Sequence, residues 1–286
     1  MKKITSYELQ SKFTLLKEKL SRLPNLVVAY SGGVDSTFLL ATASEVLGER
    51  VMGVIGVSSS LPSAELQEAL QFARQFGWQV TQIPTNEMQD ENYLKNDDQR
   101  CYYCKKELFS EAFHYARQNG FSVIADGTNA DDSTDYRPGS RAAAELSVIR
   151  PLKDCGLSKA EIRQLSRDMG LPSWNKAELA CLSSRIPIGN RVTAPALRRV
   201  EQAENFLKQK GFHILRVRHH DKLARIEVSP QEIDRLLQQD MREQVDQFFR
   251  SLGYLYVTVD LRGYRRGSLN AERPALAEMK TPDHGK

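Results

Sequence analysis

The stretch LVVAYSGGVDSTFLL, residues 26–40, joins an apolar run to two glycines, several hydroxyl groups and an aspartate. The apolar run Leu26–Tyr30 predicts a buried strand, and the residues after Gly33 predict a helix. Backbone N–H groups at the start of a helix are unpaired, and the helix dipole favours negative charge there. The turn Ser31–Ser36 between the two elements is therefore expected to bind an anion such as a nucleotide phosphate.

This turn lacks the lysine of the G-x-x-x-x-G-K-[ST] phosphate loop and carries Asp35 instead. Ser31, Ser36 and Thr37 place hydroxyl groups around it. A carboxylate repels a polyphosphate unless a cation lies between them, so Asp35 predicts a bound Mg²⁺ ion. The alternative is a tight strand-to-helix turn built on two glycines. The hydroxyls and the aspartate make that alternative the weaker one.

A second polar segment, Asp126–Asp132, follows the expected strand Ser122–Ala125 and has the sequence DGTNADD. Polar and acidic groups at the carboxyl end of a parallel strand suit the same ligand cleft as the first loop. An acidic cluster near Asp35 would support a metal-bridged triphosphate. Taken alone, the segment is equally well explained as an Asp/Asn/Gly turn.

Three of the four cysteines have positions that suit a metal centre. Cys101 and Cys104 are three residues apart, so both thiols can face one side of a turn or of a helix start, and Cys181 could be a third thiolate. Three cysteines that hold a four-iron cluster leave one iron open, whereas zinc would need a fourth protein ligand. Burial as small apolar side chains is the alternative. Cys155 has no partner at such a spacing, and we interpret it as structural.

Hydroxyl groups and arginines recur in the last third of the chain. The segment Ser183-Ser184-Arg185 and the pair Arg216-x-Arg218 carry the groups that typically bind phosphate. Arg216 and Arg218 alternate along an expected strand, so both side chains lie on one face. A solvated strand face remains the alternative for this pair.

Strand-like and helix-like patterns alternate up to about residue 190, which predicts an α/β fold with a doubly wound parallel sheet. Ligands of such sheets bind at the carboxyl ends of the strands, where the Ser31–Ser36 turn is expected. The capping box Ser158-x-x-Glu161 opens a helix that should stop at Gly170. Further strands are expected at Val51–Val57, Gln79–Ile83, Ser122–Ala125 and Ser147–Ile149, and further helices at Ala64–Phe76 and from about Lys105.

A different pattern follows the segment Ile188–Thr193, and it predicts a smaller α+β domain. Its expected elements are helix 195–210, strands Ile214–Arg218 and Ala224–Val228, helix 231–252 and strand Tyr254–Asp260. The expected domains are therefore residues 1–190 and 191–270, followed by a flexible tail at 271–286.

The composition indicates an ordinary soluble protein. The chain has 286 residues, of which 41% are hydrophobic and 27% charged, with a net charge of +4. No apolar run approaches the roughly 18 residues of a membrane span, and the N-terminus lacks an apolar signal core. We expect a cytoplasmic protein with neither a membrane nor a nucleic-acid partner. Four cysteines in such a chain are not a disulfide framework.

With these residues in view, the sequence resembles a known family. SGGVDS is the signature of the PP-loop ATP pyrophosphatases, which adenylate a carbonyl oxygen and release pyrophosphate. Further motifs resemble the LarE family, the pyridinium-3,5-bisthiocarboxylic acid mononucleotide synthases of nickel-pincer cofactor assembly. These motifs are DYRPG (Asp135–Gly139), PLKDCGLSKAEIRQLSRDMGLPSWNK, ACLSSRIPIG, VRHHDKLARIEV and GYLYVTVDLRGYRRGSLN, and the resemblance covers about residues 20–270.

The resemblance implies an adenine nucleotide alpha hydrolase-like fold and an ATP- and Mg²⁺-dependent sulfurtransferase. A carboxylate of a pyridinium mononucleotide would be adenylated and then converted to a thiocarboxylate. Asp35 and Lys105 would be catalytic, with Lys105 neutralising charge on the adenylate. The second domain would bind the substrate and form a homo-oligomer. The implied ATP site is Ala29, Ser31, Gly32, Gly33, Asp35, Ser36, Ser58, Gly127 and Asn129, and the implied substrate site is Ser184, Arg185, Arg216 and Arg218.

Members of the family differ in their sulfur source. Some sacrifice the sulfur of one of their own cysteines, and others carry an extra sulfide on the open iron of a [4Fe-4S] cluster. Cys101, Cys104 and Cys181 match the cluster pattern, with Cys181 also in a catalytic role, and sulfide or a sulfur donor would supply the sulfur. Glu204 matches a position where some members have a carboxylate of unclear role, and it is the lowest-ranked of the expected metal ligands.

Three other functions remain open on the sequence. An iron–sulfur tRNA thiolase shares the PP-loop and a Cys-x-x-Cys pair, but it needs an RNA surface, and no RNA-binding module or basic stripe is recognisable. An amide-forming ligase that uses ammonia would leave the three cysteines unexplained. A nucleotide sensor would bind ATP without releasing pyrophosphate.

Overall fold

The computed structural model describes residues 6–133, 138–177 and 180–265. These residues form two compact units. The first contains the described residues up to Leu94 together with Asp98–Ala180, and the second contains Lys95–Asp97 together with the described residues from Cys181. The units thus divide at residue 180, before the boundary at residue 190 expected from the sequence. Most of the DYRPG motif and the tail 271–286 lie outside the described residues.

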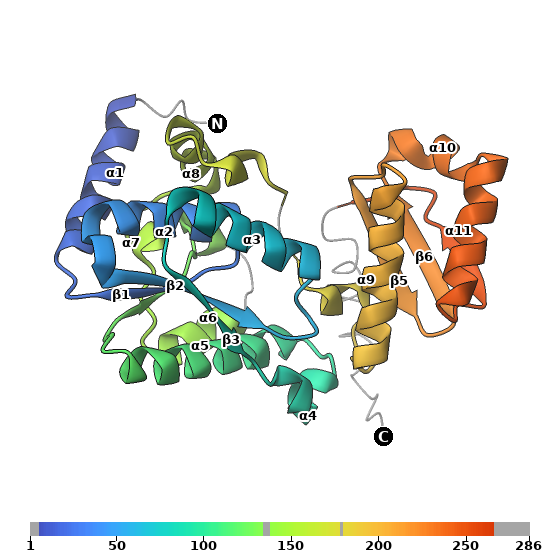
Figure 1. Ribbon diagram of the computed structural model, residues 1–286, viewed down its shortest axis with the longest axis horizontal. Coiled ribbons are helices and arrows are strands. Elements are labelled where there is room, and N and C mark those ends of the chain that lie inside the picture. Colours follow the sequence, from blue (N-terminus) through green and yellow to red (C-terminus); the bar gives the residue numbers. More distant parts are fainter. Residues whose placement is uncertain (1–5, 134–137, 178–179, 266–286) are drawn as a thin grey trace, which may run out of the picture. The chain divides into compact units, whose positions relative to one another are not determined.

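The first unit is built on a four-stranded parallel sheet in the order β3-β2-β1-β4 (Figure 1). This confirms the α/β fold with a doubly wound parallel sheet. The expected strand Ser147–Ile149 is reduced to one parallel bridge between Ile149 and Ala125. The strands are β1 (Leu26–Ala29), β2 (Val51–Val57), β3 (Val80–Pro84) and β4 (Ile124–Ala125).

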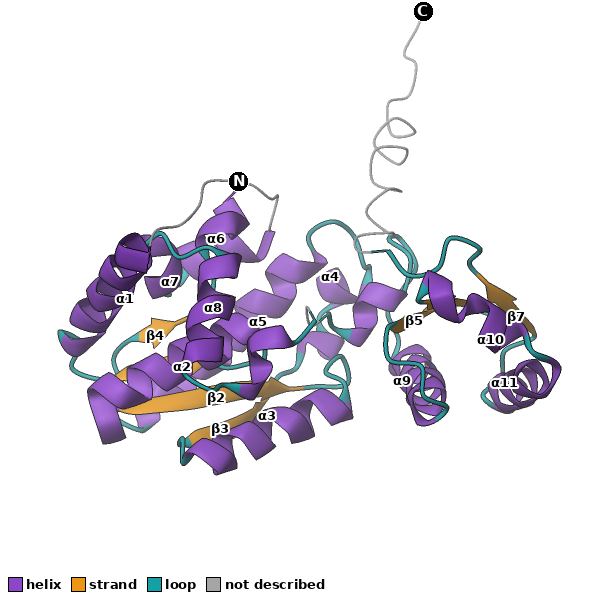
Figure 2. Ribbon diagram, turned by 90° about the horizontal axis from the view of Figure 1, so that it is seen from above, coloured by secondary structure: helices purple, strands orange, loops and turns teal. Residues whose placement is uncertain are grey.

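Helices cover both faces of this sheet, as Figures 1 and 2 show. The alternation of side chains along β1 explains the two layers, because Leu26 and Val28 point into one core and Val27 into the other. The first core is closed by α1 (Ser6–Ser21), α2 (Val34–Leu47), α3 (Ser63–Phe76), α7 (Pro151–Asp154) and α8 (Lys159–Asp168). The second is closed by α5 (Arg100–Gln118) and α6 (Pro138–Glu145), and the short α4 (Glu91–Leu94) precedes α5.

Helix α5 begins at Arg100, five residues before the start expected from the sequence. The expected start near Lys105 was wrong because the polar residues 95–100 resemble a loop, although the helix already forms over the Cys-x-x-Cys pair. Cys101 and Cys104 therefore lie in the first two turns of a helix and share one of its faces.

The strand order determines where a ligand can bind. The chain proceeds from β1 outward to β2 and β3, and then returns to place β4 on the opposite side of β1. Doubly wound sheets bind ligands at the carboxyl ends of the strands, where this direction reverses. Here that position lies between the loops that follow β1 and β4, and both loops carry the polar residues singled out from the sequence.

The second unit is a three-stranded mixed sheet with helices on one face. Strand β5 (Leu215–His220) is antiparallel to β6 (Leu223–Val228), and β6 is parallel to β7 (Tyr256–Val259). The expected helix 231–252 is divided, because Gln238 adopts an extended backbone with ψ 143°. The helices α9 (Ala194–Gln209), α10 (Ile233–Leu237) and α11 (Gln239–Ser251) share one apolar core with the sheet.

None of the helices in the described ranges combines the length and the apolar character that a bilayer crossing requires.

The capping box at the start of α8 forms as predicted and extends into an ion pair. The Glu161 carboxylate accepts hydrogen bonds from the Ser158 N–H at 2.7 Å and from Lys12 Nζ at 2.7 Å. Glu161 is only 1% exposed, and burial alone would raise its pKa. The hydrogen bonds from Lys12 and Ser158 outweigh that effect, so the pKa of Glu161 is lowered. Lys12 thereby connects α1 to α8.

We expect Glu161→Gln to reduce the free energy of unfolding by about 1–3 kcal/mol at neutral pH, because hydrogen bonds to a charged group are lost. A lowered folded-state pKa stabilises the fold above the unfolded pKa, and this stabilisation disappears as the pH falls through the folded value. The deficit of the variant should therefore shrink in acid, which urea unfolding at neutral pH and at about pH 3 would measure. Glu8→Gln is the matched control, since Glu8 lies 3.9 Å from the same Lys12 but is largely exposed, and it should change little.

Candidate functional site

The loop after β1 has the backbone geometry of an anion site. Gly32 has a φ of +71°, and a Cβ atom there would lie 2.6 Å from the Cβ of Ala69, so only glycine fits. Gly33 is the N-cap of α2 and provides no side-chain hydrogen bond to the first turn. Ala29 ends β1 directly before this loop and is nearly buried. The start of α2 therefore keeps its N-terminal amides for an external acceptor.

Two serines close the loop on itself. The Ser31 N–H donates to Ser36 Oγ at 3.1 Å, and the two hydroxyl oxygens are also 3.1 Å apart. Ser36 Oγ lies 3.3 Å from the carbonyl oxygen of Gly33, to which it can donate. These contacts fix the curvature of the loop before any ligand is bound.

Asp35 lies in the first turn of α2 with its two carboxylate oxygens in different environments. Oδ2 accepts hydrogen bonds from Lys159 Nζ at 2.6 Å and from Asn129 Nδ2 at 3.4 Å. Oδ1 is buried and has no hydrogen-bond partner among the described residues. Burial raises the pKa of Asp35, although Lys159 and Asn129 oppose the shift. A mostly buried carboxylate with one unused oxygen beside a helix N-terminus fits a divalent cation that bridges to phosphate.

The loop after β4 contacts this carboxylate as the strand order requires. A Cβ atom on Gly127 would lie 2.8 Å from the Ser36 backbone nitrogen, so the two loops approach backbone to backbone. Asn129 reaches Asp35 from this loop, and its own N–H donates to Asp132 at 3.0 Å. Gly127 and Asn129, which the sequence singled out, are thus brought to Asp35 by the fold.

Lys159 was missed by sequence reasoning, which found no lysine within the first loop. It is the first residue of α8, and its N–H donates to Asp131 Oδ2 at 2.8 Å. The capping box at Ser158 marks the start of this helix. Ile149 lies beside β4, in the segment where the sequence predicts a strand, so the chain between Ile149 and Ser158 passes the carboxyl end of β4. That combination was the available signal.

Ser58 lies just beyond the carboxyl end of β2 and is engaged by a buried acid. Its hydroxyl donates to Glu87 Oε1, and Ser60 Oγ donates to the same oxygen at 2.9 Å. Glu87 follows β3 and is 3% exposed. The loops after β2 and β3 are therefore tied together next to the loop after β1.

The cysteines belong to different units. Cys101 is exposed and Cys104 is partly buried, both in α5 of the first unit, whereas Cys181 is the partly buried N-cap of the 3₁₀ turn Leu182–Arg185 in the second. Cys155 is buried in the core, where burial raises the pKa of its thiol. Among the described residues of each unit, no three His, Cys, Asp or Glu side chains lie close enough together to hold a metal ion. A centre on Cys101, Cys104 and Cys181 would require thiols from both.

Lys105 follows the cysteine pair on α5. Its ammonium lies 5.2 Å from the centre of the Phe109 ring. A Cβ atom on Gly139 would approach Lys105 Cγ to 2.9 Å, so the glycine leaves room for the lysine stem.

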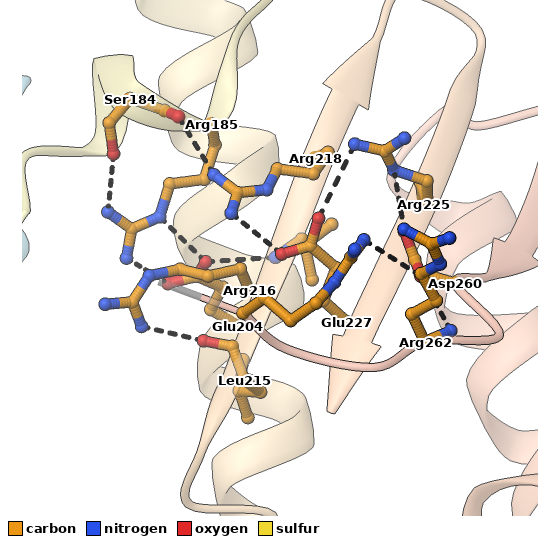
Figure 3. A network of polar contacts seen from close by, with 12 residues as sticks. Ser184, Arg185, Glu204, Leu215, Arg216, Arg218, Arg225, Glu227, Asp260 and Arg262 are labelled. Atoms are coloured by element: carbon orange, nitrogen blue, oxygen red, sulfur yellow. Dashed lines mark hydrogen bonds and ion pairs between the residues drawn. The ribbon is translucent and has the colours of Figure 1, made fainter. Parts of the chain in front are cut away.

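The second unit contains a network of arginines and acids that joins the turn Leu182–Arg185, α9, β5 and β6 (Figure 3). Arg185 binds both oxygens of Glu204 through Nε and Nη2, at 2.9 and 3.0 Å. Its Nη1 donates to the carbonyl oxygen of Cys181 at 3.0 Å and to Ser184 Oγ at 3.1 Å. Glu204 also accepts the Val217 N–H at 3.0 Å. Arg185 and Glu204 are both almost completely buried, so this pair anchors the turn after Cys181 to β5.

Arg218 and Arg225 face each other across β5 and β6 and share one carboxylate. Glu227 is completely buried and lies 2.7 Å from Arg218 Nη2 and 3.5 Å from Arg225 Nη2. Arg218 Nη1 also donates to the carbonyl oxygen of Ser184 at 3.1 Å. Arg218 therefore connects the Ser184 turn to the centre of the sheet.

Arg216 differs from these neighbours. Over the described residues it forms no ion pair, and its hydrogen bond is to the carbonyl oxygen of Leu215 at 2.7 Å. Burial and then the neighbouring Arg185 lower its pKa. A half-buried guanidinium next to two others, without a carboxylate of its own among the described residues, fits an incoming anion.

Comparison with known proteins agrees with this geometry. The model of the NAD synthase family matches residues 9–176. An uncharacterized protein of Synechocystis sp. is 42% identical over 262 residues, which cover 92% of this chain and 98% of that protein. The pyridinium-3,5-bisthiocarboxylic acid mononucleotide synthase of Lactiplantibacillus plantarum is 34% identical over 263 residues, which cover 92% of this chain and 95% of that enzyme.

A more distant relative matches only part of the chain. The NH(3)-dependent NAD(+) synthetase of Finegoldia magna is 25% identical over 166 residues, or 55% of this chain. The alignment with the Lactiplantibacillus plantarum enzyme spans 263 residues and so includes the second unit, which begins at Cys181 apart from residues 95–97. The strand–loop–helix that opens the sheet, its Asp35 carboxylate and this full-length similarity identify the chain as a LarE-like member of the NAD synthase family of PP-loop ATP pyrophosphatases.

Proposed function

We propose that the protein is an ATP-dependent sulfurtransferase that converts a carboxylate of pyridinium-3,5-biscarboxylic acid mononucleotide to a thiocarboxylate for nickel-pincer cofactor biosynthesis. The observation that carries the proposal is the 34% identity to the bisthiocarboxylic acid mononucleotide synthase along both units. The NAD synthase match, in contrast, ends at residue 176 and so does not include Arg185, Arg216 and Arg218 of the second unit. The proposal thus rests on the second unit as much as on the nucleotide loop.

The first unit would carry the ATP chemistry. The start of α2 would receive the phosphates, and Asp35 Oδ1 would hold Mg²⁺, which would offset phosphate charge. A substrate carboxylate oxygen forms a bond to the α-phosphorus of ATP, and the bond from that phosphorus to the pyrophosphate oxygen breaks. Lys159, which pairs with Asp35 at 2.6 Å, would donate to the phosphates, and a bound cation would supply the positive charge at Asp35 in its place. Lys105 stabilises the developing negative charge on the adenylate.

The cysteines would carry the sulfur chemistry. Cys101, Cys104 and Cys181 form no disulfides, so their thiols suit a [4Fe-4S] cluster. The cluster would leave one iron open and present sulfide for transfer. The sulfide sulfur then bonds to the carbonyl carbon of the adenylate, and AMP leaves with the electron pair of the broken carbon–oxygen bond. Free sulfide or a donor protein would restore the sulfur, and we expect a homo-oligomer that acts without nucleic acid.

Arginines of the second unit would hold the substrate phosphate. Of Arg185, Arg216 and Arg218, only Arg216 lacks a carboxylate partner among the described residues. Arg218 lies two residues along the same strand and donates to the carbonyl oxygen of Ser184. Arg185 supports the same turn through Glu204. In this arrangement Glu204 uses both oxygens for Arg185, so metal binding by Glu204 would first require that pair to open.

We expect Lys159→Met to lower the rate of pyrophosphate release by about 10- to 100-fold, because one charge-assisted hydrogen bond to phosphate is lost. The affinity for the pyridinium substrate should change little. Lys17→Met is the matched control, since the Lys17 ammonium pairs with the exposed Glu45. Equal rates in the two variants would remove Lys159 from the ATP site.

Arg216→Ala should raise the KM for the mononucleotide roughly 10- to 100-fold and leave the KM for ATP nearly unchanged. The reason is that Arg216 belongs to the second unit, whereas the loops that surround Asp35 belong to the first. Steady-state pyrophosphate release with each substrate varied in turn measures both constants. A parallel rise for ATP and mononucleotide would place Arg216 outside the substrate site.

The function itself is tested by anaerobic purification of the full chain, followed by incubation with ATP, Mg²⁺, sulfide and the biscarboxylate mononucleotide. Thiocarboxylate and pyrophosphate should form together, as read by mass spectrometry and a coupled phosphate assay. Pyrophosphate without a thiocarboxylate would favour an amide-forming ligase. Sulfur incorporated into tRNA, but not into the mononucleotide, would favour a tRNA thiolase.

A further inference from the structure

Arg216 occupies an electrostatically unfavourable position. It lies near Arg185 and Arg218, and burial together with these two guanidinium groups lowers its pKa, although Glu204 and Tyr264 oppose the shift. Arg185 and Arg218 each have a carboxylate, Glu204 and Glu227, within 3 Å. Like charges would drive the Arg216 side chain out toward water unless other contacts hold it.

Among the described residues, two contacts hold the Arg216 side chain. One is the hydrogen bond to the Leu215 carbonyl oxygen, which belongs to the adjacent residue on the same strand. The other is Tyr264, whose ring centre lies 5.2 Å from the guanidinium carbon of Arg216. An aromatic ring attracts a guanidinium through its face and leaves the N–H groups at the guanidinium edge free for an acceptor.

The fold fixes Tyr264 at this position through a tight turn after β7. The Asp260 N–H donates to the Ile226 carbonyl oxygen at 2.9 Å, and the Tyr264 N–H donates to the Val228 carbonyl oxygen at 2.7 Å. Gly263 between them has a φ of +66°, and a Cβ atom there would lie 2.6 Å from the Val228 oxygen. The turn must therefore lie flat on β6, which delivers the ring to Arg216.

We infer that Tyr264 is a positioning residue for phosphate binding, which acts by holding Arg216 among its like-charged neighbours with the guanidinium edge presented to the anion. The inference concerns a phosphate monoester, or inorganic phosphate as its simplest form. It rests on the proposed function only in naming the mononucleotide as the physiological ligand. Tyr264 itself need not touch the anion.

The test measures inorganic phosphate binding to the full-length protein by calorimetry and the KM for the mononucleotide by pyrophosphate release. Tyr264→Leu should weaken phosphate binding and raise that KM roughly tenfold, with kcat and the KM for ATP unchanged. Tyr264→Phe keeps the ring and should bind like the wild type. Tyr256→Leu, at a tyrosine on β7 that is 63% exposed, is the matched control and should also bind normally.

A double-mutant cycle separates positioning from a general structural role. In the Arg216→Ala background, Tyr264→Leu should cause no further loss, because the ring acts through Arg216. Additive losses, or unchanged phosphate binding in Tyr264→Leu, would overturn the inference. If Tyr264→Leu does not fold, Tyr264→Met in the same cycle decides the question. Failure of thiolation with intact, Tyr264-dependent phosphate binding would reject the proposed function and leave this inference standing.

Discussion

Asp35→Asn should lower the rate of pyrophosphate release at least about a hundredfold, while the protein remains folded. The substitution keeps the size of the side chain but removes the charge that would hold Mg²⁺ on the unpartnered Oδ1, and bound metal ions contribute several kcal/mol of charge stabilisation in such reactions. The measurement is the pyrophosphate release rate across a Mg²⁺ titration, with circular dichroism as the folding check. Wild-type dependence on Mg²⁺ in Asp35→Asn would exclude a metal role for this carboxylate.

Without ligand, Asp35→Asn should increase the stability of the protein relative to the wild type at neutral pH, although it lowers the rate of pyrophosphate release. Burial raises the pKa of Asp35, and a group with a raised folded pKa stabilises the fold below its unfolded pKa and loses that contribution as the pH rises through the folded value. The wild type should therefore lose stability from acid toward neutral pH relative to Asp35→Asn. Mg²⁺ with ATP at a hundredfold excess over Kd should add about 2.7 kcal/mol to the wild type and much less to the variant. Equal ligand stabilisation of both proteins would contradict the assignment.

Cys101→Ala, Cys104→Ala and Cys181→Ala should each abolish thiolation and the iron–sulfur cluster together. Anaerobic wild-type protein should be brown and carry roughly four irons per chain, and each variant should be colourless, because a three-cysteine cluster tolerates the loss of no ligand. Adenylation should persist in all three variants, since the proposed ATP contacts lie around Asp35. Iron and sulfide analysis, absorbance and pyrophosphate release measure the three properties separately.

Cys155→Ala is the control for these variants, because Cys155 is buried in the core of the first unit and should affect neither iron nor thiolation. Sacrificial chemistry predicts a different pattern. It would deliver at most one sulfur per chain and leave a dehydroalanine at Cys181, which mass spectrometry after turnover detects. A dehydroalanine at Cys181, together with full activity of the Cys101→Ala variant, would reject the cluster hypothesis. The proposed sulfurtransferase activity would remain.

The sequence by itself determined the elements whose signals are local. The apolar run at Leu26, the glycines at 32 and 33 and the capping box at Ser158 each depend on neighbours a few residues away, and each formed as predicted. The repeated strand–helix alternation was enough to predict the doubly wound parallel sheet and the smaller α+β domain. Helix boundaries without a local sequence signal could not be predicted. The break at Gln238 and the start of α5 at Arg100 are examples, because no strong helix breaker or cap marks either position.

Only the tertiary structure decided which charges meet. Lys159 and Asp35 are 124 residues apart, and the return of the chain beside β4 brings them within 2.6 Å. Sequence spacing also treated Arg185, Arg216 and Arg218 as equivalent phosphate ligands, whereas two of them are committed to Glu204 and Glu227. A residue type states what a side chain can bind. Whether that side chain is already paired depends on partners that only the folded chain supplies. In a low-dielectric environment, those partners decide which guanidinium remains able to bind an anion.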